Sequence, residues 1–77
     1  MLHIKMTYKN SFEYYDRAET MDEATAIIEG CAVNQAADTK SEDWWLFFPI
    51  FWTITDEESR QTIAAGYADE EGELTSA

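Results

Sequence analysis

The fold is limited above all by the densest aromatic run in the chain, which reads Trp44-Trp45-Leu46-Phe47-Phe48-Pro49-Ile50-Phe51-Trp52. These nine residues are too few to span a bilayer as a helix, which needs about 20 apolar residues. The aromatic and β-branched content of the run, which continues into Thr53-Ile54-Thr55, predicts a strand. Proline cannot donate to a strand ladder, so Pro49 requires an edge strand, a bulge, or two strands that break there.

In an extended strand, the side chains of this run alternate between two faces. The first face would hold Trp44, Leu46, Phe48, Ile50, Trp52 and Ile54, and the second Trp45, Phe47, Pro49, Phe51, Thr53 and Thr55. One helix can cover only one of these faces. A break at Pro49 could turn both sets inward, or a homodimer could cover the second face. Otherwise Trp45, Phe47 and Phe51 form an exposed apolar patch, which usually marks a binding site.

The first 18 residues predict an antiparallel hairpin. Apolar and polar residues alternate in the opening segment, as in a half-buried strand, with Leu2, Ile4, Met6 and Tyr8 on the apolar face. Asn10-Ser11 can form the turn. A second alternating stretch then places Phe12 and Tyr14 opposite Glu13, Tyr15 and Arg17.

A helix is predicted to begin after Thr20, because Thr20-Met21-Asp22-Glu23 matches a capping box. The two acidic residues of this motif would lie in the first turn, where the helix dipole favours negative charge. Helical spacing then gives an apolar stripe that can cover a sheet, made of Ala24, Ile27, Ile28 and Cys31. The alanine-rich segment 31–37 favours continuation of the helix past Gly30.

The rest of the chain predicts a polar loop at residues 38–43 and a second hairpin, in which the aromatic strand turns at residues 56–59 and returns through residues 60–67. We therefore expect an α+β fold of order β-β-α-β-β, with one helix packed on a small antiparallel sheet, in a single domain of residues 1–68. Residues 69–77 have little to bury and should form a flexible acidic C-terminal tail.

Charge limits the classes of partner. The chain has 16 acidic residues against five lysines and arginines, a net charge of -11. Nucleic-acid binding depends on basic side chains that displace counterions. We therefore expect no direct binding to nucleic acid or to a membrane. Two interpretations of the acidity remain open: it keeps a small apolar domain soluble, or it imitates a nucleic-acid backbone and complements a basic groove.

The residues offer little for catalysis, so we expect no enzymatic activity and no cofactor. His3 is the single histidine and lies on the polar face of the first strand. Cys31 lies on the apolar helix stripe, where a thiol is usually a small buried hydrophobe. One cysteine excludes an intramolecular disulfide and fits a reducing interior. No secretion signal is recognisable, so we expect a cytoplasmic protein.

Three acidic blocks surround the aromatic run, and two of them are candidate binding sites. Neither block reproduces the ligand spacing of a calcium loop, so no metal site is predicted. The two blocks should lie near opposite ends of the last strand. Their carboxylates could there contact basic residues of a partner that normally bind phosphate groups. The candidate partner-binding residues are Asp56, Glu57, Glu58, Asp69, Glu70 and Glu71, with Trp45, Phe47 and Phe51 as apolar anchors.

The segment Tyr15-Asp16-Arg17-Ala18-Glu19-Thr20-Met21-Asp22-Glu23-Ala24 resembles the strand-to-helix junction of small bacteriophage inhibitor proteins, among them inhibitors of host RNA polymerase and some anti-CRISPR proteins. The resemblance implies a short, acidic, non-enzymatic host-takeover protein, similar to a DNA mimic, that blocks a nucleic-acid-handling machine. We therefore expect a phage or mobile-element inhibitor that binds the basic nucleic-acid-binding surface of a host protein, in the cytoplasm of the host bacterium. The alternative is a small homodimeric structural or regulatory module whose acidity serves only solubility.

Overall fold

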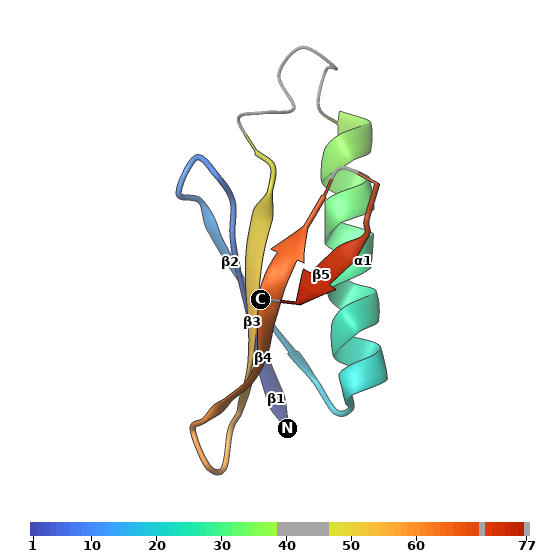
Figure 1. The fold of residues 1–77 in the computed structure, drawn as a ribbon. Coiled ribbons are helices and arrows are strands. Elements are labelled where there is room, and N and C mark those ends of the chain that lie inside the picture. The colour runs from blue at the N-terminus through green and yellow to red at the C-terminus, as the bar shows by residue number, and fades with distance from the viewer. Residues whose placement is uncertain (39–46, 70, 77) are drawn as a thin grey trace.

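The computed structural model describes residues 1–38, 47–69 and 71–76, which form one helix and a five-stranded antiparallel sheet. The strands are β1 (Leu2–Thr7), β2 (Glu13–Ala18), β3 (Ile50–Asp56), β4 (Thr62–Ala68) and β5 (Leu74–Ser76), and the helix is α1 (Met21–Asp38). Figure 1 shows α1 lying along one face of the sheet. The predicted α+β fold of order β-β-α-β-β is confirmed, and β5 follows as an additional strand.

The strands lie in the order β2-β1-β3-β4-β5, so β1 pairs with both β2 and β3. Residues that lie opposite each other in these two ladders share one face of the sheet. Ile4 lies opposite Asp16 and Ile54, and Met6 lies opposite Tyr14 and Trp52. The predicted hairpin of residues 2–18 is confirmed, as is the pairing of β3 with β4 as a second hairpin. A bulge between Ile54 and Thr55 shifts the register of that second hairpin.

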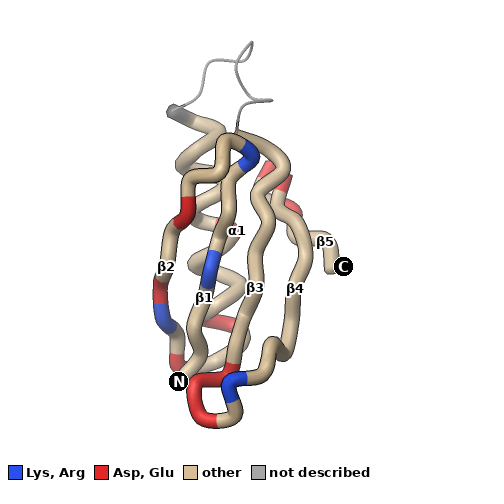
Figure 2. Tube along the Cα trace, turned by 90° about the vertical axis from the view of Figure 1, so that its left-hand side faces the viewer, with Lys and Arg blue, Asp and Glu red and all other residues tan. Residues whose placement is uncertain are grey.

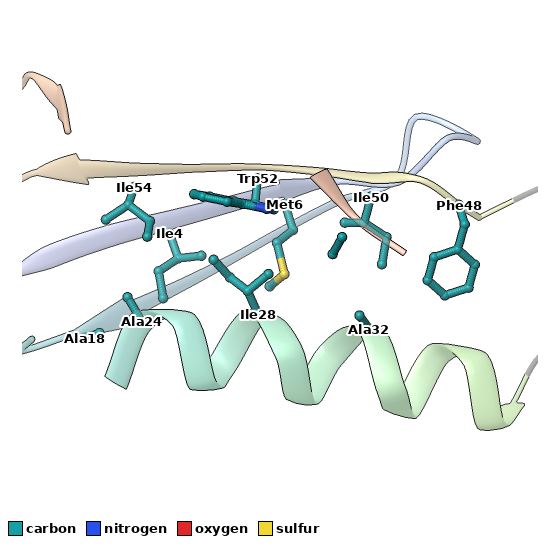
Figure 3. Packing of buried hydrophobic residues seen from close by; sticks show 11 residues of the cluster. Ile4, Met6, Ala18, Ala24, Ile28, Ala32, Phe48, Ile50, Trp52 and Ile54 are labelled. Carbon is teal, nitrogen blue, oxygen red and sulfur yellow. The ribbon is translucent and has the colours of Figure 1, made fainter. Parts of the chain in front are cut away.

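The core lies between α1 and the sheet. Helical spacing places Ala24, Ile28 and Ala32 on the buried side of α1, each fully buried, and Ile27 and Cys31 pack beside them. Figure 3 shows Ala24, Ile28 and Ala32 facing the inward side chains of β1 and β3. The predicted apolar stripe is therefore confirmed, and α1 continues through Gly30 as expected. It ends at Asp38, which the prediction had placed in the polar loop, and residues 39–43 of that loop lie outside the described residues. Within the described part of the chain, no helix combines the length and the apolar character needed to cross a membrane.

The start of α1 follows the predicted cap. The Thr20 hydroxyl accepts a hydrogen bond from the Glu23 amide at 3.1 Å, and the Thr20 carbonyl accepts one from the Ala24 amide at 3.0 Å. Asp22 and Glu23 lie in the first turn. The first contact satisfies an amide that the helix itself leaves without an acceptor, and the second is the first regular hydrogen bond of the helix.

Within the described part of the aromatic run, residues 47–52, the strand begins only at Ile50. β3 begins at Ile50, directly after Pro49, so the described ladder contains no proline. Phe48 lies in the core together with Ile50, Trp52 and Ile54, as expected for the first face. Trp44 and Leu46, which the same pattern placed beside them, lie outside the described residues.

The segment expected to be a flexible tail, residues 69–77, contains β5 within its described part. β5 pairs with β4 from Gly66 opposite Ser76 to Ala68 opposite Leu74, and Leu74 packs against the core. Gly72 makes the preceding turn with φ of 83°, a left-handed conformation that glycine adopts without strain. It is buried against α1, where an added Cβ would lie 2.7 Å from Val33 Cγ2. The prediction of a flexible tail was wrong for this part, because Leu74 packs against the apolar core and Gly72 allows the turn that brings the chain back along β4.

Candidate partner-binding surfaces

The two acidic blocks lie in turns at opposite ends of β4, as the sequence pattern predicted. The β3–β4 acidic turn contains Asp56, Glu57 and Glu58, and the β4–β5 acidic turn contains Asp69, Glu71 and Glu73. Figure 2 shows the first at the bottom of the molecule and the second above, where β4 leads into β5. Glu70, one of the candidate residues, lies outside the described residues.

Asp56 holds the β3–β4 turn together. Its carboxylate accepts a hydrogen bond from the Ser59 amide at 3.2 Å, and its carbonyl accepts one from the Arg60 amide at 2.8 Å. Hydrogen bonding from Ser59 lowers the pKa of Asp56 below its ordinary value. Arg60 completes the turn with φ of 59°. The first role of Asp56 is therefore to shape the turn.

Glu57 is already paired with two basic side chains. Arg17 Nη2 donates to both carboxylate oxygens, at 3.0 and 2.9 Å, and His3 Nε2 lies 3.4 Å from Oε1. The hydrogen bond from Arg17, followed by that from His3, lowers the pKa of Glu57. A cation from a partner would have to compete with Arg17 for this carboxylate. Glu58, the third acid of the turn, is exposed and is the best placed of the three to meet a partner.

The β4–β5 acidic turn gathers three carboxylates. One carboxylate oxygen each from Asp69, Glu71 and Glu73 lie within 4.8 Å of one another. Asp69 Oδ1 accepts hydrogen bonds from the Glu71 and Glu73 amides, both at 2.9 Å, so the backbone of the turn is fixed while the two glutamate side chains remain exposed. Among the described residues, the ion pairs join Glu13 or Glu57 to basic side chains of β1 and β2, and none includes this turn.

Glu73 is a member of this cluster that the sequence reasoning missed as a site residue. The sequence pattern that could have identified Glu73 is the alternation of acidic residues at positions 69, 71 and 73, because alternate side chains of an irregular turn can point to one side. The gathered carboxylates can receive an ammonium or guanidinium group, and their chemistry also suits a hard divalent cation.

The three predicted aromatic anchors do not share one environment. Phe51 points away from the core and is 48% exposed, in a tilted ring contact with Tyr67 at a centroid distance of 4.7 Å. Phe47 is partly buried and packs against the core, while its carbonyl accepts a hydrogen bond from the Lys9 amide at 3.3 Å. Trp45 lies outside the described residues. Of the described anchors, Phe51 is therefore the one that offers a ring to a partner.

The sheet face opposite α1 carries most of the basic side chains that the structure describes. Lys5 lies 3.7 Å from Glu13, and the Tyr15 hydroxyl donates to Glu13 at 2.5 Å; the bond from Tyr15 and then the charge of Lys5 lower the pKa of Glu13. A shallow hollow of about 320 Å³ lies on the same side, lined by His3, Tyr15, Asp16 and Arg17. This hollow does not coincide with the predicted acidic sites.

Cys31 lies partly buried on α1, and burial, followed by the charge of Asp16, raises the pKa of its thiol. A raised pKa leaves less of the reactive thiolate at neutral pH.

The candidate binding surfaces of the described structure are the two acidic turns and the open face of the sheet. Comparisons of the chain with models of known protein families, with curated proteins and with solved structures found no match.

Proposed function

We propose that this protein is a non-enzymatic inhibitor of the phage or mobile-element type, which binds the basic nucleic-acid-binding surface of a host protein in a stoichiometric complex. The observation that carries the proposal is the β4–β5 acidic turn, where three carboxylates lie within 4.8 Å of one another in a turn fixed by hydrogen bonds to Asp69. The resemblance of residues 15–24 to small phage inhibitors suggests the biological setting.

Close carboxylates repel one another and thereby favour an incoming cation. Lysine and arginine side chains that bind phosphate oxygens also bind carboxylate oxygens, and arginine does so with two parallel hydrogen bonds. Because hydrogen bonds to Asp69 already fix the backbone of this turn, docking of such a residue has to order side chains but not the backbone, which favours affinity. The cluster can therefore stand in for a phosphate group at a basic site.

The β3–β4 acidic turn, at the other end of β4, offers a further anionic contact. β4 has seven residues, so its ends lie about 23 Å apart at about 3.3 Å per residue. Glu58 at one end and the β4–β5 acidic turn at the other can thus contact basic residues that are well separated on a nucleic-acid groove. The net charge of -11 would also accelerate the encounter with a basic surface, most strongly at low salt.

The experiment is a pull-down from bacterial lysate with tagged wild-type protein and two charge variants, each at low and at high salt. Glu71→Gln combined with Glu73→Gln removes two charges from the β4–β5 acidic turn and keeps the backbone amides that Asp69 binds. The matched control, Glu19→Gln combined with Asp22→Asn, removes two exposed charges near the start of α1. Adding Glu58→Gln to the first variant tests the other end of β4.

We expect the wild type to retain a nucleic-acid-binding protein at low salt and to release it as the salt concentration rises. The double variant of the β4–β5 acidic turn should bind that protein at least about tenfold more weakly, which corresponds to about 1.4 kcal/mol, and the control should lose much less. Equal losses in the two double variants would show that only net charge matters. Equal capture by all of them would contradict the proposal.

A further inference from the structure

β2 is an outer strand of the sheet, and in the described part of the chain no strand lies along its free edge. Figure 2 shows β2 along the left side of the sheet, next to β1. It has six residues, whereas the other outer strand, β5, has three. Two of its aromatic side chains are exposed, Tyr14 at 40% and Tyr15 at 60%. An unpaired edge of this length is a template on which another strand can pair.

The register of the β1–β2 hairpin determines which backbone groups point to the free edge. The Tyr8 amide donates to the Phe12 carbonyl at 2.8 Å, and in an antiparallel ladder such bonded pairs alternate with unbonded ones. Counting on from this pair, the residues of β2 whose amides and carbonyls point away from β1 are Glu13, Tyr15 and Arg17. The Arg17 amide agrees with this assignment, because it donates to the Asp16 carboxylate at 2.8 Å and not to β1.

We propose that β2 pairs with β2 of a second copy of this chain, in an antiparallel register centred on Tyr15, so that the two sheets of a homodimer form one continuous sheet. In this register Tyr15 lies opposite Tyr15 of the second copy, and Glu13 lies opposite Arg17. The inference is independent of the proposed function, because neither acidic turn includes a residue of β2.

Charge complementarity in this register identifies a second copy as the occupant. A two-fold axis forms each pair twice, so both Glu13 carboxylates meet an Arg17 guanidinium, and no two like charges lie directly opposite each other. On the other face of the sheet Tyr14 lies opposite Asp16 of the second copy, and within one chain the Tyr14 hydroxyl already donates to the Asp16 carboxylate at 3.5 Å. The sequence of β2 therefore complements its own reversed copy.

Neighbouring registers lose this complementarity. Only a slide by two residues keeps the outward backbone groups of the two strands opposite each other. A slide in one direction places Asp16 opposite Asp16, where like charges repel. A slide in the other direction places Arg17 opposite Ser11, in the β1–β2 turn. Both slides separate Glu13 from Arg17, so the register centred on Tyr15 is the favoured one.

The contacts that these side chains make within one chain are compatible with the second copy. Arg17 binds both Glu57 oxygens through Nη2, at 3.0 and 2.9 Å, and a guanidinium has further N–H groups for another carboxylate. Glu13 lies 3.7 Å from Lys5 in an exposed ion pair, which costs little to rearrange. The Asp16 carboxylate has to leave the Arg17 amide, which then donates to the Glu13 carbonyl of the second copy.

The expected dimer is weak. Its three pairs of outward residues can exchange up to about six backbone hydrogen bonds, because each bonded pair of an antiparallel ladder makes two. The net charge of -11 on each chain opposes association. The dissociation constant should therefore be on the order of tens to hundreds of micromolar.

Sedimentation velocity from about 1 μM to about 1 mM protein tests the inference with charge reversals. Glu13→Arg and Arg17→Glu should each weaken dimerisation at least about tenfold, because like charges then lie opposite each other, and the double reversal should restore it. Glu13→Arg makes the chain less acidic, so net charge alone would strengthen the dimer. Glu19→Arg is the matched control, because Glu19 is exposed directly after β2 and its reversal changes the net charge equally.

Crosslinking tests the register directly, in a Cys31→Ala background. Tyr15→Cys should form an intermolecular disulfide, because Cα atoms of a bonded antiparallel pair lie about 5.5 Å apart, within the range that a disulfide spans. Tyr14→Cys is the matched control, since its two copies lie two residues, about 7 Å, out of line along the strands. Circular dichroism checks that each variant remains folded.

Dimers that each single reversal weakens and the double reversal restores, with more crosslinking at position 15 than at position 14, support the inference. A wild type that remains monomeric at about 1 mM would overturn it. The inference also fails if Glu19→Arg weakens the dimer as much as Glu13→Arg, or if the double reversal does not restore it.

Discussion

Gly66 lies opposite Trp52 across the β3–β4 ladder, and a Cβ added at Gly66 would stand 2.8 Å from the indole Cζ2. The same Cβ would stand 2.0 Å from the Thr75 carbonyl oxygen on β5. The absence of a side chain at Gly66 therefore lets Trp52 fill the core and lets β5 pair with β4. The two contacts connect the aromatic run to the strand that carries the β4–β5 acidic turn.

Gly66→Ala should destabilise the protein, because either Trp52 or β5 must move away. Overpacking of this kind costs typically about 1–3 kcal/mol in the free energy of unfolding, measured by urea denaturation. Gly30→Ala is the matched control, since nothing lies within 4 Å of a Cβ at that helical position. It should stabilise α1 by about 0.5–1 kcal/mol. A Gly66→Ala protein as stable as the wild type would contradict the close packing.

Ile28→Ala should remove a fully buried side chain from the helix face that covers the sheet. The lost burial and the cavity left behind typically cost about 2–5 kcal/mol. Ile63→Ala makes the same chemical change at a position that is 50% exposed, and it should cost less than about 1 kcal/mol. Thermal or urea unfolding of the two variants compares them directly. Similar losses from both would show that α1 does not pack on the sheet through Ile28.

Thr20→Ala should remove the hydrogen bond that the Thr20 hydroxyl accepts from the Glu23 amide. Losing an N-cap of this kind costs about 1 kcal/mol of stability. Thr25 offers a control inside α1, where its hydroxyl donates to the Asp22 carbonyl at 3.0 Å. Thr25→Ala should change stability by no more than about 0.5 kcal/mol, because alanine is the better helix former. If the Thr25 variant is the less stable one, the cap assignment fails.

Glu57 should make stability depend on pH in the acid range. Its pKa in the folded protein is depressed by Arg17 and then by His3, relative to an ordinary value of 4.5. A depressed pKa contributes stability that is present above the ordinary value and is lost as the pH falls through the folded value. Wild type should therefore exceed Arg17→Gln in stability near neutral pH, and the difference should shrink below about pH 4.

Urea midpoints at several pH values measure this effect, which should be modest because the pair is exposed to solvent. Lys9→Gln removes the same charge from the β1–β2 turn and controls for the change in net charge. A stability difference between wild type and Arg17→Gln that stays constant from neutral pH to about pH 3 would show that the Arg17–Glu57 contact does not set the pKa of Glu57.

Local patterns predicted the elements whose signals do not depend on distant contacts. The alternation of residues 2–9 placed Ile4 and Met6 in the core, the capping box placed the start of α1, and helical spacing placed Ala24 and Ile28 on its buried face. These patterns work because each one reflects the geometry of a single element. The order of the first four strands and the helix followed from them.

The features that escaped prediction depend on tertiary contacts. Leu74 forms a strand because β4 leaves an edge there and the core leaves an apolar surface, and neither is visible in the local sequence. Glu57 pairs with Arg17, 40 residues away, a contact that no local pattern indicates and with which a partner's cation would have to compete. Glu73 joins Asp69 and Glu71 only because the turn at Gly72 brings their carboxylates together.

In the proposed complex, the acidic turns occupy a site of the host protein that otherwise binds nucleic acid. The most direct measurement is competition, in which a short DNA duplex or an RNA strand is titrated into the complex of this protein with the host protein that it retains. We expect nucleic acid to release the host protein in proportion to its own affinity, and Glu71→Gln with Glu73→Gln to lower the concentration of nucleic acid needed. A complex that persists in saturating nucleic acid, with the nucleic acid bound beside it, would show that the acidic turns do not occupy the nucleic-acid site.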